Sequence, residues 1–228
     1  KAAKVQVGGD ADPTALNLDA GFFERGGFAH FNVTGDAGVN IADGTVLRPT
    51  VISRELSQGY TLQATGSNLE AFSSLQKRDS RVRQVANVSF AANGIRGAKV
   101  RLGEGAAILA DDKATVSFTA DNRVDILGTV RAAGGSISAT VSSSAFDPSS
   151  AVWVGERAVL DVAGVARTYS NTNGLTQGEV LAGGSIKLDG KGAYVLTQAG
   201  SSINVSGAAP VNLDVPNEAG GLGRSVGS

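Results

Sequence analysis

The stretch GGSIKLDGKGAYVLTQAGSSINVSG, residues 183–207, shows the pattern that decides the fold of this chain. Apolar residues alternate with polar ones for a few positions at a time, and glycine separates the runs. Alternation with a period of two is typical of a short β-strand that buries one face. Glycine adopts positive φ angles freely, so each run ends where the backbone can turn sharply. The stretch therefore predicts short strands joined by tight corners.

The same unit, two apolar residues around a variable one and then a turn residue, recurs along the chain. A sandwich or barrel usually has longer strands and a core of larger side chains. Self-similar short strands with glycine corners instead favour a solenoid, here an all-β parallel β-helix with about ten coils of roughly 20–25 residues. Further copies of the unit are FNVTG (31–35), RVDILG (123–128), AVLDVAG (158–164) and IKLDG (186–190).

Inward apolar residues of such a solenoid stack in columns from coil to coil. The alternation places one apolar pair of each unit inside and the residue between them outside. The residues expected in the buried columns are Ile137, Leu160, Ile186, Ile203 and Val205.

The composition fits thin stacked layers and excludes several kinds of site. Glycine accounts for 31 of 228 residues, which is well above ordinary usage. There is no cysteine, so the chain contains neither a disulfide nor a thiolate metal site. The formal net charge of −1 gives no electrostatic reason to expect binding to nucleic acid or to an anionic membrane.

The chain is predicted to be one β-helix segment over residues 1–228. Loop insertions are expected at 67–83 and 142–152, and residues 216–228 form a Gly-rich end. Because position 1 is not Met and residues 5–7 already resemble a strand, we expect an internal fragment of a longer shaft. Coils without a cap expose unpaired backbone groups, so end-to-end self-association through residues 5–7 or 211–215 is expected.

Four segments resemble the filamentous haemagglutinin-like exoproteins, which Gram-negative bacteria release by two-partner secretion. These segments are GGFAHFNVTGDAGVNIADGTVLRP (26–49), VDILGTVRAAGGSI (124–137), SAVWVGERAVLDVAGVA (150–166) and GEVLAGGSIKLDGKGAYVLTQAGSSINVSG (178–207). The resemblance implies a right-handed, single-stranded parallel β-helix within a virulence-associated surface fibre. It also implies adhesion, a secreted or cell-surface location, and an outer-membrane transporter as partner of the full-length protein.

No catalytic, cofactor or metal motif accompanies the repeats, and the chain is expected not to be an enzyme. His30 is the only histidine, and the alternation points it outward. The aspartate pairs at 10 and 12 and at 111 and 112 are interpreted as turn residues. The alternative function is a β-helix polysaccharide lyase or hydrolase, which would need carboxylates and cations from adjacent coils in one groove.

The candidate contacts to a host or bacterial surface receptor or glycan are a basic run and the sole tryptophan. A basic run attracts anionic glycans, although it is also typical of a solvated loop. Trp153 alternates with Val152 and Val154, so its ring is expected outside the coil, where it could stack on a sugar. The candidate residues are Lys77, Arg78, Arg81, Arg83 and Trp153.

Overall fold

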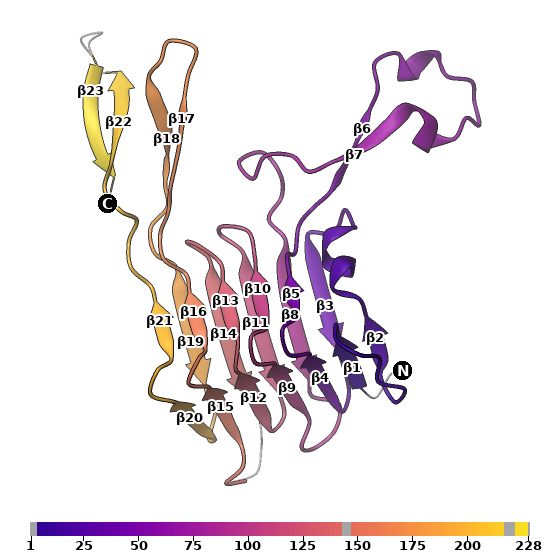
Figure 1. Ribbon diagram of the computed structural model, residues 1–228, viewed down its shortest axis with the longest axis vertical. Helices are drawn as coiled ribbons and strands as arrows, with labels where there is room; N and C mark the ends of the chain where they lie inside the picture. Colours follow the sequence, from indigo (N-terminus) through magenta and orange to yellow (C-terminus); the bar gives the residue numbers. More distant parts are fainter. Residues whose placement is uncertain (1–3, 143–146, 217–221, 228) are drawn as a thin grey trace.

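Short alternating strands wind around one axis, as Figure 1 shows for the computed structural model. The structure describes residues 4–142, 147–216 and 222–227. Within these ranges the regular structure consists of strands and short 3-10 helices, and the strands other than those of three hairpins form three parallel sheets. None of the described helices has the length and apolar character needed to cross a membrane. The predicted all-β parallel β-helix is confirmed.

The largest sheet, here called the long sheet, runs along the whole stack and contains seven of the described strands. In spatial order they are β2 (Leu16–Leu18), β1 (Lys4–Val7), β4 (Gly38–Ile41), β9 (Lys99–Leu102), β12 (Arg123–Ile126), β15 (Ala151–Val154) and β20 (Tyr194–Thr197).

Two shorter sheets complete the wall of the stack. The first short sheet consists of β3 (His30–Thr34), β8 (Asn87–Ala92), β11 (Thr115–Ala120), β14 (Ser136–Val141) and β19 (Ser185–Asp189). The second short sheet consists of β5 (Val46–Leu47), β10 (Ala107–Leu109), β13 (Thr129–Arg131), β16 (Val159–Asp161) and β21 (Ser202–Asn204).

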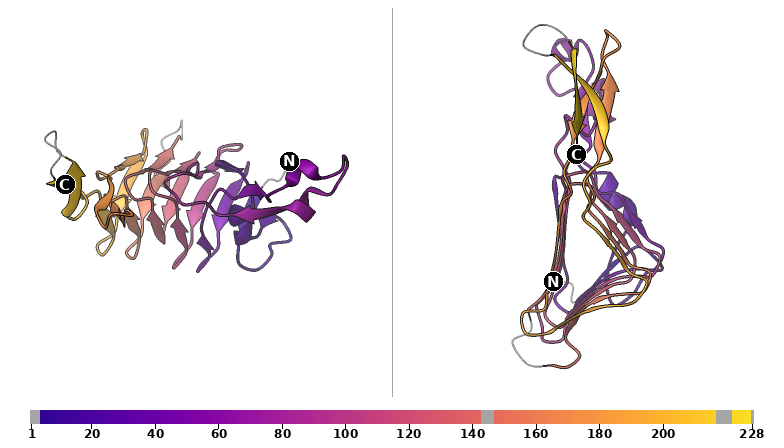
Figure 2. Two further views of the ribbon diagram at one scale, coloured as in Figure 1. Left: turned by 90° about the horizontal axis from the view of Figure 1, so that it is seen from above. Right: turned by 90° about the vertical axis from the view of Figure 1, so that its left-hand side faces the viewer.

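Each coil takes one strand from the first short sheet, then one from the long sheet and one from the second short sheet. Five such coils follow one another in the described residues, so the expectation of about ten coils is wrong. A coil without an insertion has the expected length of roughly 20–25 residues, because Val116 pairs with Ile137, the residue 21 positions later, in the next coil. The chain makes fewer coils because long insertions take up the remaining residues. Seen end-on, the three sheets enclose a triangular cross-section (Figure 2).

Inward side chains stack in register from coil to coil. Val88, Val116 and Ile137 are paired across the first short sheet, and each is at most 2% exposed. The rings of Phe90 and Phe118 stack beside this row, with centroids 5.7 Å apart. The period-two alternation thus places one apolar column behind another, as the sequence predicts for Ile137.

Burial decreases in the last coil. Leu160 is fully buried as predicted, and Ile186 is partly buried against the core. Ile203 and Val205, however, are 47% and 52% exposed, so their predicted burial is wrong. β21 is the last strand of the second short sheet, and no described residue continues the stack beyond it.

Two equivalent glycines show why small residues recur at the corners. Gly135 precedes β14, and Gly184 precedes β19 in the next coil. A Cβ atom on Gly135 would lie 2.1 Å from the carbonyl oxygen of Ala114, and one on Gly184 would lie 1.9 Å from that of Gly135. Neighbouring coils therefore approach too closely at this corner to admit a side chain.

Aromatic side chains close the N-terminal end of the stack. The 3-10 helix η1 (Ala20–Glu24) places the fully buried Phe23 with its ring centroid 5.2 Å from that of Phe31 and 6.2 Å from that of Phe90. β1 lies between β2 and β4, so residues 5–7 are not an open edge, and that expectation is wrong.

Three antiparallel hairpins leave the stack, and each follows a strand of the second short sheet. They therefore project from one corner of the triangle, as Figures 1 and 2 show. The hairpins are β6 (Ser53–Leu56) with β7 (Ser73–Gln76), β17 (Ala166–Ser170) with β18 (Thr176–Val180), and β22 (Val211–Pro216) with β23 (Leu222–Gly227).

The hairpins revise the predicted insertions. The expected loop at 67–83 contains η3 (Leu69–Phe72) and β7, and it is part of a longer insertion that also contains η2 (Tyr60–Leu62). Residues 143–146 of the second expected loop lie outside the described residues, and its last two residues belong to β15. Residues 211–215 pair with β23 in a hairpin, so they are not the open end of the stack.

Candidate functional site

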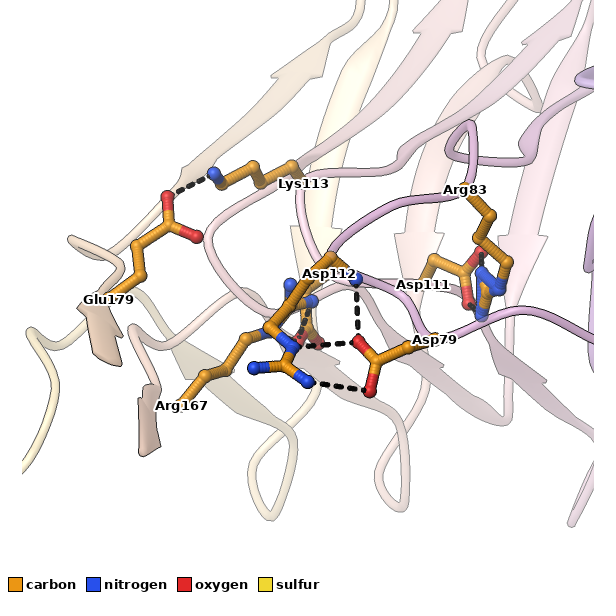
Figure 3. Close-up of polar contacts among 8 residues, drawn as sticks. Asp79, Arg83, Asp111, Asp112, Lys113, Arg167 and Glu179 are labelled. Atoms are coloured by element: carbon orange, nitrogen blue, oxygen red, sulfur yellow. Dashed lines mark hydrogen bonds and ion pairs between the residues drawn. The ribbon is translucent and has the colours of Figure 1, made fainter. Parts of the chain in front are cut away.

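The corner that bears the hairpins carries a cluster of paired charges. Its centre is the short turn between β10 and β11, which presents Asp111, Asp112 and Lys113 in sequence. The segment that returns from the first insertion, residues 77–86, lies on one side of this turn, and the β17–β18 hairpin lies on the other. Figure 3 shows the charged side chains of these three segments gathered at the corner.

Arg83 and Asp111 form a buried, bidentate ion pair. The two terminal nitrogens of the guanidinium donate to the two carboxylate oxygens, each over 2.5 Å. Only 5% of the Arg83 side chain and 13% of the Asp111 side chain is exposed. The Nε of Arg83 is also buried and has no hydrogen-bond partner among the described residues. The pair therefore anchors the end of the first insertion to the stack.

Two more ion pairs anchor the β17–β18 hairpin to the same turn. Arg167 on β17 donates to the carboxylate of Asp112, and Lys113 donates to Glu179 on β18. The hydrogen bond from Lys113 lowers the pKa of Glu179. Both strands of the hairpin are thus held at their base, which fixes the direction in which the hairpin projects.

The first insertion and the β17–β18 hairpin also contact each other. Arg81 donates to Asp79 over 2.9 Å, and its guanidinium carbon lies 4.6 Å from the ring centroid of Tyr169. The hydrogen bonds from Arg81 lower the pKa of Asp79 to about 2. A hollow of about 340 Å³ between the two insertions is lined by these side chains and by Asp112 and Arg167. Every charged group that lines this hollow has a partner of opposite sign.

The structure separates the four residues of the predicted basic cluster. Arg83 is buried in its ion pair, so the expectation that it belongs to an exposed cluster is wrong. Arg81 is exposed, but it is engaged with Asp79 and Tyr169. Lys77 and Arg78 are exposed directly after β7. Lys77 and Arg78 are therefore the two residues of this run that are exposed and form no ion pair within the described residues, as the contact hypothesis requires.

Trp153 lies on the outward face of the long sheet, far around the stack from the hairpins. Its neighbours Val152 and Val154 are fully buried, while Trp153 itself is half-buried, as the alternation predicts. The guanidinium carbon of Arg123 lies 5.0 Å from the centroid of its ring. One face of the indole is therefore occupied by a cation from the preceding coil.

The remaining candidate chemistry has structural explanations. His30 is exposed at the start of β3. Asp12 accepts hydrogen bonds from the backbone N–H and the hydroxyl of Thr14, which lower its pKa, and it shapes a turn as expected. In the ranges that the structure describes, no three His, Cys, Asp or Glu residues are arranged to hold a metal ion.

The interpretation of Asp111 and Asp112 as simple turn residues misses their partners. Arg167 and Glu179 were not singled out from the sequence at all. The sequence does contain a signal for their hairpin, because Asn173-Gly174 between two polar strands is a strong hairpin marker, and Gly174 has a φ of +75°.

Comparison with models of protein families, with curated proteins and with solved structures finds no match to this chain.

Proposed function

We propose that this chain is a structural and adhesive segment of a large, secreted filamentous exoprotein at the bacterial surface, and that it acts without catalysis. The observation that carries this proposal is the row of three hairpins on one corner of a stacked β-helix. In two-partner secretion, the full-length protein would leave the cell through an outer-membrane transporter. The resemblance in sequence supports this location and partner.

The stack would act as a rigid spacer, and the hairpins would act as its contact points. Strands in neighbouring coils are about 4.8 Å apart, so every coil lengthens the shaft by that amount. Ion pairs at the base of two hairpins reduce the freedom that a receptor would otherwise have to freeze out on binding. The tip of the first hairpin, residues 57–72, would contact a host or bacterial receptor, together with the exposed Lys77 and Arg78 at its base.

An adhesion assay with shortened hairpins tests this proposal. Beads coated with the native chain should bind epithelial or bacterial cells. Leu56 is paired with Ser73, so replacing residues 57–72 by Asn-Gly keeps β6 and β7 in register and removes the tip. The control replaces residues 171–175 between Ser170 and Thr176 in the same way.

We expect the first variant to lose adhesion and the control to keep it, with unchanged far-ultraviolet circular dichroism in both. Absence of adhesion by the native chain to every cell type, or full adhesion by both variants, would contradict the proposal.

One observation supports the alternative, a polysaccharide lyase or hydrolase. A hollow of about 330 Å³ on the outward face of the long sheet is lined by side chains that include Asp12, Lys99, Arg101 and Asp125. A glycosidase acid needs a raised pKa, whereas the pKa of Asp12 is lowered by its hydrogen bonds to Thr14. Incubation with acidic and neutral polysaccharides should release no unsaturated or reducing ends. Turnover that disappears in Asp12→Asn or Asp125→Asn would establish the enzyme instead.

Self-association would use the C-terminal end of the stack. Val195 and Ile203, on the inward side of the last coil, are 43% and 47% exposed. In the described part of the chain, β19, β20 and β21 are the edge strands of their sheets at this end. Because Phe23 closes the opposite end, a second copy would pair with this end through its own C-terminal end.

A further inference from the structure

Cations and aromatic rings line up along the outward face of the long sheet. The strands of this sheet are in register, so equivalent outward residues of successive coils form rows parallel to the axis. The first row consists of Lys4, Gly38, Lys99, Arg123, Ala151 and Tyr194, in that order. The rows follow the axis with a repeat of about 4.8 Å, which is comparable to the length of one hexose ring.

The hollow of about 330 Å³ lies at the N-terminal part of this face. Gly38 occupies the position between Lys4 and Lys99, so no side chain projects from the sheet between these two residues. A second outward row, two residues further along each strand, consists of Gln6, Asn40, Arg101, Asp125, Trp153 and Leu196. It places two amides at the hollow, where Asn40 donates to the side-chain oxygen of Gln6 over 2.7 Å. Gly38 therefore contributes only backbone to the hollow, and the rest of the lining combines charged and amide side chains with apolar residues such as Val5 and Ala15.

Ion pairing divides the cations of this face into two kinds. Arg101 donates to Asp43 over 2.7 Å, and Arg123 donates to Asp125 over 2.6 Å. Lys4 and Lys99 are exposed and form no ion pair among the described residues. The two lysines thus line the hollow without an ion-pair partner, although the charge of Lys4 also acts on the carboxylate of Asp12, which lines the same hollow.

Aromatic and apolar side chains continue the face beyond the hollow. Trp153 follows Asp125 in the second row, and Leu196 follows Trp153. Tyr194 is 57% exposed at the end of the first row, and Leu196 is 42% exposed beside it. Rings that keep one face and a polar tip accessible suit the mixed apolar and hydroxylated surface of a sugar.

We propose that this face binds a linear acidic polysaccharide laid along the axis of the stack. Acidic groups of the polymer would contact Lys4 and Lys99, and its sugar rings would pack on Tyr194 and Trp153. The carboxylate of Asp125 would accept hydrogen bonds from hydroxyl groups of the polymer. This inference deepens the proposed adhesive function and rests on it. It places the polyanion on the shaft and not on the hairpins.

Two matched variants test the assignment. Lys4→Gln with Lys99→Gln removes two exposed charges from the face, and Lys77→Gln with Arg78→Gln removes two exposed charges from the base of the first hairpin. Binding of heparin, polygalacturonate and neutral dextran is measured for each chain by biolayer interferometry, at low salt and at physiological ionic strength. Heparin presents sulfates and polygalacturonate presents only carboxylates, so the two polymers distinguish a sulfated host source from a uronate source.

We expect the native chain to bind one or both polyanions and not dextran, more weakly as salt increases. The first double variant should bind about tenfold more weakly, a change of about 1.4 kcal/mol, whereas the hairpin variant should bind like the native chain. Tyr194→Ser should also weaken binding, because this exposed ring has no role in the core.

Equal losses in the two double variants, or native affinity in Lys4→Gln with Lys99→Gln, would overturn the proposal, as would absence of binding to both polyanions. Cell adhesion measured on the same chains separates this result from the proposed function. Adhesion that depends on residues 57–72 but not on the two lysines, together with no polyanion binding, refutes only this site. Absence of adhesion by the native chain to every cell type refutes the proposed function itself.

Discussion

Replacing Asp111 with alanine should release the first insertion from the stack. The change leaves the Arg83 guanidinium buried, at 5% side-chain exposure, with no carboxylate to accept its two hydrogen bonds. Removing one partner of a buried pair costs about 3–5 kcal/mol, because the remaining charge stays desolvated. At about 2–4 °C per kcal/mol for a chain of this size, we expect the thermal midpoint to fall by roughly 6–20 °C.

Two measurements follow this change. Thermal unfolding by circular dichroism gives the shift of the midpoint. Limited trypsin digestion reports on the segment itself, because cleavage after Arg81 and Arg83 requires this backbone to leave the corner. Asp111→Ala should expose these bonds before the rest of the stack unfolds.

A double variant and a control isolate the contribution of the pair. Arg83→Met with Asp111→Leu replaces both charges by apolar groups and should recover most of the lost stability. Asp79→Ala breaks an exposed pair at the same corner and should leave the midpoint nearly unchanged. The reasoning fails if Asp111→Ala keeps the native midpoint and the native digestion pattern.

Three further predictions concern the core, the pH dependence and the end of the stack. Ile137→Asn, in a fully buried position, should cost on the order of 2–5 kcal/mol. Ile203→Asn should cost less than about 1 kcal/mol, and equal midpoint shifts would contradict the register of the last coil. The folded pKa of Asp79 is about 2, against an ordinary value of 3.8. Because this pair is exposed, its contribution to stability is small; it is present above about pH 4 and is lost as the pH falls towards 2. Carboxyl NMR should show this titration, and a value near 3.8 would exclude the pair in solution. Ile203→Lys should abolish any concentration-dependent dimer seen by analytical ultracentrifugation, and a dimer of undiminished affinity would place the interface elsewhere.

The fold was predictable because its information is local. Alternation specifies a strand and its buried face within a few residues, and glycine marks the corner, before the strand at Ile137 and after it at Leu160. The close approach at Gly135 and Gly184 explains why those corners accept no larger residue. The number of coils was not predictable in this way. A hairpin strand such as 211–215, with the sequence VNLDV, alternates like a coil strand, and only the pairing partner distinguishes the two.

The site was less predictable because its contacts join distant parts of the sequence. Arg167 and Asp112 are 55 residues apart, and Arg83 and Asp111 are 28 apart. Their proximity depends on where each insertion leaves the stack and on how many coils lie between. Trp153 is different, since its outward position follows from its two apolar neighbours alone. A sequence pattern can therefore indicate the face of a strand, but it does not identify the partner across a corner.

Arginine and lysine have different roles on this chain: arginines stabilise the structure through ion pairs, and two lysines are proposed to bind a ligand. Buried and half-buried pairs use arginine, whose planar guanidinium matches a carboxylate in two places and remains charged when desolvated. Arg83 and Arg167 bind the insertions to the stack in this way, and their charge is neutralised within the fold. Lys4 and Lys99 instead extend a compact, hydrated charge from the long sheet into solvent. A density of positive residues along the sequence is therefore a poor guide to binding here. The run from Lys77 to Arg83 is the densest, yet two of its four cations, Arg81 and Arg83, are paired with aspartates. Lys4 and Lys99, in contrast, are far apart in the sequence, and the winding of the chain brings them to one hollow.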